Sequence, residues 1–281
     1  MTSPHRSAAR IQIGTTLRRM REEAGLPRER PAEVLHCTTT KIGNIETAVS
    51  GVRRAELEKL LDLYDVDEAT RDDLLNLNTE ANRRRPRSKL GGMIQPWLRR
   101  ILDVEATATE ALYSSFELVP AVLQTEAYAR ALMVACGVSG ETLEKNLQVR
   151  MERRALLTDR EPPLRFWAVI AEPALRANIG GPEVMRDQAK HLLALTELEN
   201  VVVQVMPQGA GTHPLTGTTL TLFRLPDKLP SLVSVDTPFG DHFVDAVHLV
   251  EKTSHWFDYT RAKALGVEES RELLTRITEE T

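Results

Sequence analysis

Polar side chains that can read DNA bases gather in the stretch 38–46, which runs TTTKIGNIE. If this stretch is a helix that opens with Thr38 as its hydroxyl cap, Ile42 and Ile45 turn inward. The side chains left on the outer face are those of Thr39, Thr40, Lys41 and Asn44. Short hydroxyl and amide groups beside one lysine suit a helix that lies in a DNA major groove. The alternative is an ordinary surface helix of an all-helical domain.

Four further helices are predicted to position this one. Apolar residues recur at spacings of three and four, and Gly25 follows the first helix where a left-handed residue ends it. The dipeptide His36-Cys37 forms a tight corner before the polar helix. The five predicted ranges are 11–24, 28–35, 38–46, 53–64 and 68–83. They describe a compact bundle in which the second and third helices form a pair.

The string LRRMREEAGLPRERPAEVLHCTTTKIGNIE, within about 11–64, resembles the helix-turn-helix domain of lambda-repressor-like (XRE) regulators. The residues that carry the resemblance are Leu17, Arg18, Arg21, Gly25, Leu26, Lys41, Ile42, Ile45 and Glu46. The resemblance implies base contacts from Thr39, Thr40 and Asn44. It implies phosphate contacts from Arg28, Thr38, Lys41 and Arg53.

Three residues depart from the usual pattern of that family. His36 stands at the corner where the family usually has glycine, and left-handed geometry costs a non-glycine residue about 1–2 kcal/mol. Pro31 lies near the start of the second helix, where its missing N–H does least harm. Gly43 lies inside the reading helix and costs about 1 kcal/mol relative to alanine. We therefore expect modest DNA affinity from the head alone.

Charge is divided unevenly along the chain, whose net charge is −4. Residues 1–54 hold 10 Lys and Arg against 5 Asp and Glu, whereas 96–281 hold 19 against 26. A basic head on an acidic body suits a protein whose N-terminal part meets phosphate. The run RRRPRSK at 83–89, followed by two glycines, predicts a linker or an arm that grazes phosphate. The predicted domains are a helix-turn-helix head (1–83), a basic linker (84–94) and a body (95–281).

Helical and strand patterns alternate in the body. The predicted strands are 111–116, 164–171, 201–207, 218–225 and 231–236. The predicted helices are 96–108, 126–136, 141–158, one from Pro182, 245–265 and 267–279. The predicted class is therefore α+β: an all-helical N-terminal helix-turn-helix bundle followed by an α+β domain with a mainly antiparallel sheet.

Several phrases of the body resemble the domain that follows an XRE head in many actinobacterial, especially streptomycete, regulators. They are PWLRRILDVEATA, LVPAVLQTEAYARAL, VRMERRALL, GGPEVMRDQAKHLL and VVVQVMP, spread from Gln95 to Glu280. The resemblance implies a link to morphological development and antibiotic production. It also implies a small partner protein from a neighbouring gene, in an arrangement likened to toxin–antitoxin systems.

The sequence has no dinucleotide-binding fingerprint, no P-loop and no nucleophile elbow. His248, Glu251 and His255 share a helix face with His242 nearby, but the spacing is not that of a zinc helix. Glu172 and Arg176 follow a buried strand and, with His213, are candidates for an effector pocket; a structural ion pair is the alternative. We expect no enzyme activity, no cofactor and no metal.

The predicted function is a sequence-specific transcriptional regulator that binds a roughly palindromic operator as a homodimer. One alternative is an antitoxin-like protein that binds a small partner and autoregulates its operon, and another is a ligand sensor. The predicted partners are double-stranded DNA, a second copy of the chain and the small neighbouring-gene protein, without a membrane. We expect a cytoplasmic protein whose Cys37 and Cys136 are reduced and mostly buried.

Overall fold

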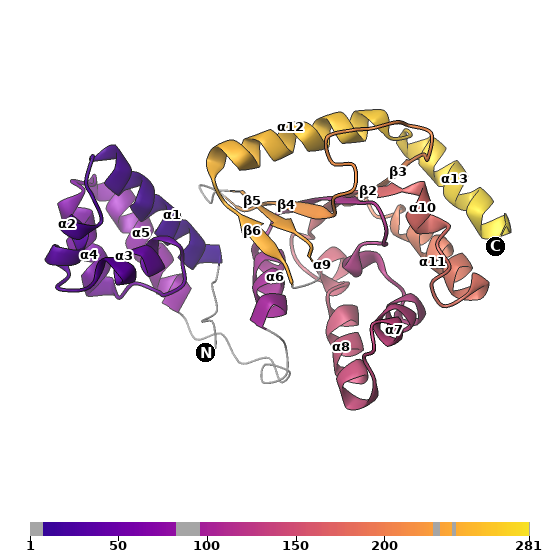
Figure 1. Cartoon of the computed structure of the whole chain (residues 1–281), viewed down its shortest axis with the longest axis horizontal. Coiled ribbons are helices and arrows are strands. Elements are labelled where there is room, and N and C mark those ends of the chain that lie inside the picture. The colour runs from indigo at the N-terminus through magenta and orange to yellow at the C-terminus, as the bar shows by residue number, and fades with distance from the viewer. Residues whose placement is uncertain (1–7, 83–95, 227–230, 238–239, 281) are drawn as a thin grey trace. The chain divides into compact units, whose positions relative to one another are not determined.

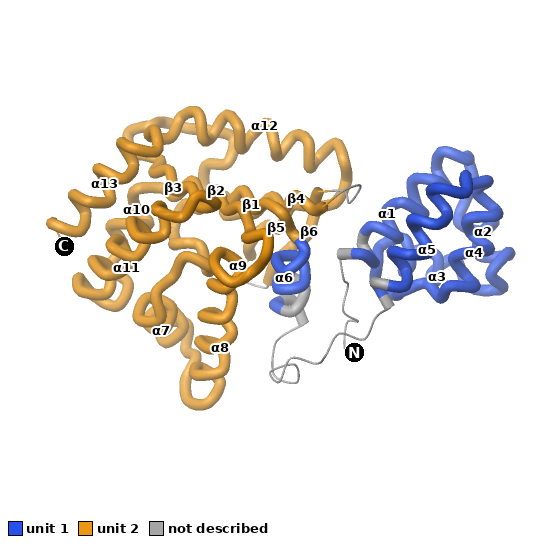
Figure 2. Tube along the Cα trace, turned by 180° about the vertical axis from the view of Figure 1, so that it is seen from behind, with its two compact units in different colours: residues 1–107 blue, residues 108–281 orange. Residues whose placement is uncertain are grey.

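The computed structural model describes residues 8–82, 96–226, 231–237 and 240–280. The chain divides into two compact units, 1–107 and 108–281 (Figure 2). Helix α6 (Pro96–Thr107) falls in the first unit, whereas the predicted body begins at residue 95. The predicted linker, 84–94, lies outside the described residues, so the predicted domain boundaries stay predictions.

Helices alone build the described head, as predicted from its apolar spacing (Figure 1). They are α1 (Ala8–Glu23), α2 (Glu29–Val34), α3 (Thr39–Glu46), α4 (Arg54–Leu63) and α5 (Glu68–Asn82). Their apolar stripes meet in one core, to which α1 contributes Leu17, α3 contributes Ile45 and α4 contributes Leu57 and Leu61. Because α3 is only eight residues long, this packing, and not helix propensity, holds it in place.

The helices α1, α2 and α4 end in the same hydrogen-bonded turn. After α2, His36 has a φ of 50°, and the N–H of Cys37 donates to the Ala32 carbonyl at 2.9 Å. This is the Schellman pattern, in which a left-handed residue lets the chain satisfy the last carbonyls of a helix. Gly25 after α1 and Asp65 after α4 repeat it. The left-handed corner predicted at His36 is confirmed.

A six-stranded mixed sheet runs through the body in the order β3-β2-β1-β4-β5-β6. The strands are β1 (Glu110–Ser115), β2 (Arg165–Ala171), β3 (Val201–Met206), β4 (Leu220–Arg224), β5 (Leu232–Val235) and β6 (His242–Val244). β1 pairs with β2, and β2 with β3, in parallel; the β1–β4, β4–β5 and β5–β6 pairs are antiparallel. The α+β class and the mostly antiparallel sheet are confirmed, although the parallel half was not predicted.

Helices lie on both sides of this sheet (Figure 1). Val250 and Phe257 of α12 (Val247–Lys263) pack on strand residues that include Leu222. On the other side lie α7 (Glu126–Ala135), α8 (Gly140–Glu152) and α9 (Ala155–Thr158). The remaining elements are η1 (Ala121–Leu123), α10 (Glu172–Leu175), α11 (Pro182–Leu195) and α13 (Val267–Glu280). The hydroxyl of Ser270 in α13 accepts from the Val205 N–H at 2.9 Å, which covers the edge strand β3.

Three predictions for the body need correction. The range 141–158 is two helices, α8 and α9, because the chain turns at Arg153-Arg154. The short elements α10 and β6 were missed, since four and three residues carry too little periodicity to predict. Cys136 is exposed, because it caps the C-terminal end of α7 beyond its buried face.

The segment 118–125 belongs to the phrase LVPAVLQTEAYARAL, and side chains from two of the other phrases of the body hydrogen-bond to it. Gln188, from GGPEVMRDQAKHLL, donates to the Leu123 carbonyl and accepts from the Thr125 N–H, both at 2.8 Å. Arg150, from VRMERRALL, donates to the Gln124 side chain at 2.7 Å. Gln188 and Arg150 therefore supply hydrogen-bond partners to polar groups of this segment that would otherwise be buried without them.

Candidate nucleic-acid interface

Close backbone contact seats α3 against α1. Ile42 and Ile45 are each 2% exposed, as their inward spacing predicted. At Gly14 of α1, a Cβ atom would stand 2.4 Å from the Ile45 carbonyl oxygen and 2.8 Å from that of Glu46. No side chain fits at that distance, so glycine sets how deeply α3 sits.

The buried carboxylate of Glu46, the last residue of α3, joins α3 to α1 and to the start of α2. The side chain of Glu46 is 2% exposed and accepts from Arg21 Nε at 2.5 Å and from Arg28 Nε at 2.8 Å. Arg21 also donates to the Leu26 carbonyl at 2.9 Å. Two guanidinium groups thus offset one buried negative charge, which would be costly without partners. Arg21, Leu26 and Glu46, three of the residues that carry the helix-turn-helix resemblance, thus meet in one hydrogen-bonded corner.

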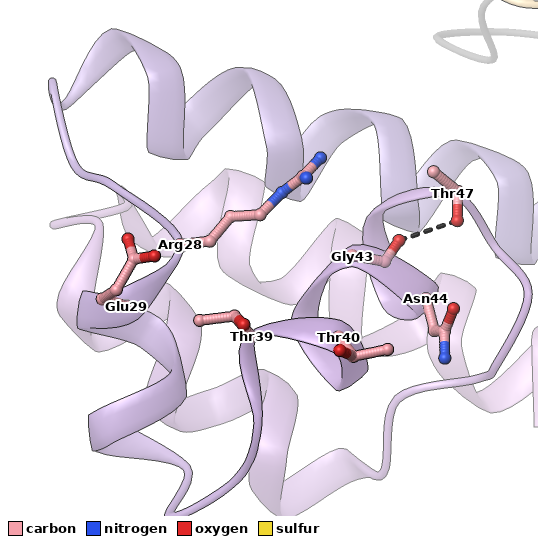
Figure 3. A pocket seen from close by; sticks show the side chains of 7 residues that line it. All are labelled: Arg28, Glu29, Thr39, Thr40, Gly43, Asn44 and Thr47. Carbon is pink, nitrogen blue, oxygen red and sulfur yellow. Dashed lines mark hydrogen bonds between the residues drawn. The ribbon is translucent and has the colours of Figure 1, made fainter.

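An open groove borders α3 (Figure 3). The residues that line it are Arg28, Glu29, Thr39, Thr40, Gly43, Asn44 and Thr47. In Figure 3 the predicted base-reading residues Thr39, Thr40 and Asn44 lie along one edge of α3. Thr40 and Asn44 stand four residues apart and so share a helix face. The structure therefore brings the three predicted reading residues together, with Arg28 beside them.

Of the other predicted phosphate contacts, Thr38 caps α3, whereas Lys41 and Arg53 both donate to Glu56 of α4. The hydroxyl oxygen of Thr38 accepts from the Lys41 N–H at 3.2 Å, which confirms the predicted cap. Lys41 Nζ donates to Glu56 Oε1 at 2.6 Å, and Glu56 Oε2 accepts from the Arg53 N–H at 3.1 Å. Burial raises the pKa of Glu56, but the hydrogen bonds from Lys41 and Arg53 outweigh it and hold the pKa below its ordinary value. Glu56 is therefore ionised at neutral pH and holds the Lys41 ammonium group in an ion pair.

Sequence reasoning missed four residues of this site: Gly14, Glu29, Thr47 and Glu56. The helical spacing of Thr40, Asn44 and Thr47 points to one face and could have found Thr47. Glu56 stands three residues after the cap of α4, where a carboxylate commonly accepts from the backbone. Gly14 could have been noticed as a lone glycine inside a helical pattern. No sequence signal places Glu29 at the groove.

The residues predicted for an effector pocket form two separate sets of contacts in the body. Glu172 accepts from Arg176 Nε at 2.8 Å, and Arg176 also donates to Glu280 at 2.7 Å. His213 instead lies 3.2 Å from the Thr260 hydroxyl. Burial lowers the pKa of His213, and Lys263 acts in the same direction. The alternative of an ion pair therefore describes Glu172 and Arg176, and the effector pocket stays a prediction.

Metal and membrane features can be checked in the described ranges. There, no group of three or more His, Cys, Asp and Glu side chains is arranged to hold a metal ion, and this includes the histidines near α12. The described helices also include none long and apolar enough to cross a membrane.

Comparison with known families agrees with this division of the chain. Residues 98–276, more than half of the chain, match the family model described as domain of unknown function (DUF5753). Residues 12–74 match the model described as helix-turn-helix domain. No curated protein and no solved structure matches the chain. The second match supports the predicted XRE-like head and indicates a DNA-binding regulator.

Proposed function

We propose that this chain, which belongs to the family described as domain of unknown function (DUF5753), is a transcriptional regulator that recognises a specific DNA operator. In this proposal α3 enters the major groove and reads bases with Thr39, Thr40 and Asn44. Arg28, Thr38, Lys41 and Arg53 hold the phosphates on either side, as the resemblance implies. The excess of Lys and Arg over Asp and Glu in residues 1–54 favours binding to DNA, which is a polyanion.

One observation carries the proposal: the edge of α3 that faces the open groove is polar, while its opposite side is locked into the head. Ile45 and Glu46 are buried against α1 at the contact with Gly14. A short helix fixed in this way holds the backbone of Thr40 and Asn44 in place. Fixed attachment points suit direct readout, because a bidentate contact to a base edge depends on geometry.

A homodimer on a roughly palindromic operator is part of this proposal. A reading helix of eight residues covers too few base pairs to select one site in a genome. Two copies related by a two-fold axis double the contacts and read two half-sites. A dimer would show a mass near twice the 31.5 kDa of one chain by light scattering.

We assign dimerisation and the sensing of a partner or effector to the body. The small neighbouring-gene protein implied by the resemblance is the candidate partner. We also propose that the body acts by binding and not by catalysis. The ion pairs of Arg176 with Glu172 and with Glu280 support this view, because they tie up the two charged groups first considered for a pocket.

Gel-shift titration of specific and random duplexes tests the function. We expect Thr40→Ala and Asn44→Ala to weaken specific binding by about 1–3 kcal/mol while random DNA is little affected. Lys41→Ala should weaken both alike, because a phosphate contact carries no sequence information. Asn146→Ala, an amide on α8 of the body, is the matched control. Equal weakening of both duplexes by all three head variants contradicts the base-reading assignment.

A further inference from the structure

The face of α3 that lines the groove, called the reading edge below, carries no arginine or lysine. The residues that α3 and its cap give to the groove are all uncharged: Thr39, Thr40, Gly43, Asn44 and Thr47. Arginine and lysine are the side chains that best recognise guanine, through its O6 and N7 acceptors. Lys41 lies on α3 too, but its ammonium group is 2.6 Å from Glu56 on α4. Guanine thus meets neither of its two preferred side chains along this edge, and only the weaker hydroxyl and amide donors remain for it.

Arg28 also lines the groove, but its guanidinium group is held back. Its Nε donates to the buried Glu46 carboxylate at 2.8 Å. Its Nη1 lies 3.9 Å from the point where a Cβ would stand on Gly43, so the group lies along the side of α3. An arginine anchored beside the helix is placed for phosphate rather than for the base edges beyond Thr40 and Asn44.

The side-chain amide of Asn44 can form two hydrogen bonds with one adenine. Its amide carries one acceptor and two donors, which match the N6 amino group and the N7 acceptor of adenine. Figure 3 draws one hydrogen bond among the groove residues, from Thr47 to Gly43, and none of these residues bonds to the Asn44 amide. The groove residues thus leave both functions of this amide to meet a base.

The threonines add apolar contact to the same edge. Thr39 and Thr40 are exposed, and each carries a methyl group beside its hydroxyl. The thymine C5-methyl group is the one apolar mark of the major groove, and threonine methyl groups pack against it. Thr47 adds a third methyl group, since its hydroxyl is engaged by the Gly43 carbonyl at 2.7 Å.

We infer that the operator presents A·T pairs to α3, with an adenine opposite Asn44 and thymine methyl groups against Thr39 and Thr40. This inference rests on the proposed function and names the base pairs that the same site selects. Its chemical content is specific: the adenine is recognised through N6 and N7, and the thymines through their methyl groups.

Base analogues test the inference with the full-length chain. Duplexes are first selected from a random library, and binding is then measured by fluorescence anisotropy at one fixed salt concentration. Deoxyuridine in place of a thymine removes only the methyl group, and 7-deazaadenine in place of an adenine removes only N7. We expect each replacement in the positions facing α3 to weaken binding roughly 5- to 100-fold. The same analogues outside the half-sites should change it by less than about twofold.

Two substitutions at one residue separate the roles of its groups. Thr40→Val keeps a methyl group and loses the hydroxyl, so it should still discriminate thymine from deoxyuridine. Thr40→Ser keeps the hydroxyl and loses the methyl group, so discrimination at the thymine that faces residue 40 should disappear while discrimination at the thymine that faces Thr39 remains. Asn44→Ala should remove the sensitivity to 7-deazaadenine alone.

The outcomes separate this inference from the proposed function. If no duplex is enriched over random DNA, sequence-specific binding fails and the inference falls with it. If a specific complex forms but ignores both analogues, the regulator stands and only the inference is overturned. Selected half-sites with a guanine whose preference vanishes in Arg28→Ala would likewise overturn it, since Arg28 would then be the reading residue.

Discussion

The Glu46 carboxylate lies 2.5 Å from Arg21 Nε, and this buried contact ties the end of α3 to α1. We predict that Arg21→Met destabilises the protein by about 3–5 kcal/mol, because it removes the deeper of the two cations around Glu46. The double variant Arg21→Met/Glu46→Met should lose less, since no buried charge remains. Urea unfolding of the single and double variants measures both values. A double variant less stable than the single one would contradict this account of the pair.

Two glycines of the head should respond to alanine in opposite ways. Gly14→Ala places a Cβ 2.4 Å from the Ile45 carbonyl oxygen, so the melting temperature and the DNA affinity should both fall. Gly43→Ala meets only Arg28, at 3.9 Å, and should raise helix stability by about 1 kcal/mol. Thermal unfolding followed by circular dichroism compares the variants. Destabilisation of similar size in both would show that the close approach at Gly14 is not special.

The carboxylate of Glu29 lines the groove that is proposed to receive DNA. We predict that Glu29→Gln strengthens DNA binding several-fold at low salt, because it removes a like charge from the path of the phosphates. The gain should shrink as salt rises, since exposed charges are screened. Glu68→Gln, at the start of α5, removes an equal charge outside the groove and is the control. Equal gains in both variants would assign the effect to net charge alone.

His191 of α11 should make the stability of the body depend on pH. Burial lowers the pKa of His191 to about 4, Arg154 acts in the same direction, and Nε2 is buried without a hydrogen-bond partner in the described structure. The unfolded chain, with a histidine pKa near 6.5, therefore binds this proton more readily than the folded one. Stability is then fully present above about pH 6.5 and declines as the pH falls toward 4.

Variants identify the histidine responsible. His191→Gln should flatten the decline of the melting temperature between pH 6.5 and 4, whereas the exposed His248→Gln should leave it unchanged. Differential scanning calorimetry across this range gives the comparison. An unchanged slope in His191→Gln would mean that other groups set the acid sensitivity.

Local features of the head could be predicted because each depends on a few neighbouring residues. The Thr38 cap and the left-handed His36 follow from the types and order of residues at two helix ends. The pairing of Lys41 with Glu56 could not be predicted, because fifteen residues separate them and only the packing of the whole head brings α3 and α4 within reach of each other.

The body shows the same limit on a larger scale. Periodicity located β1 and β2, but it cannot tell which strands become neighbours. β1 lies between β2 and β4, so one of its two partners is contributed by a segment more than a hundred residues away. Pairing over such distances, and with it the parallel pairing of β1, β2 and β3, depends on the whole fold.

The position of Glu29 at the groove of the head could not be predicted either, since it depends on how α2 packs against α3.

The division of α3 into a buried side and a polar edge bears on how such a regulator can diverge. Ile42, Ile45 and Glu46 serve folding, whereas Thr40 and Asn44 make no contribution to the core. Under the proposed function we therefore expect exchange of the edge residues to change the preferred DNA without disturbing the scaffold. Duplicated copies of such a gene can acquire new target promoters through two or three substitutions while every copy still folds.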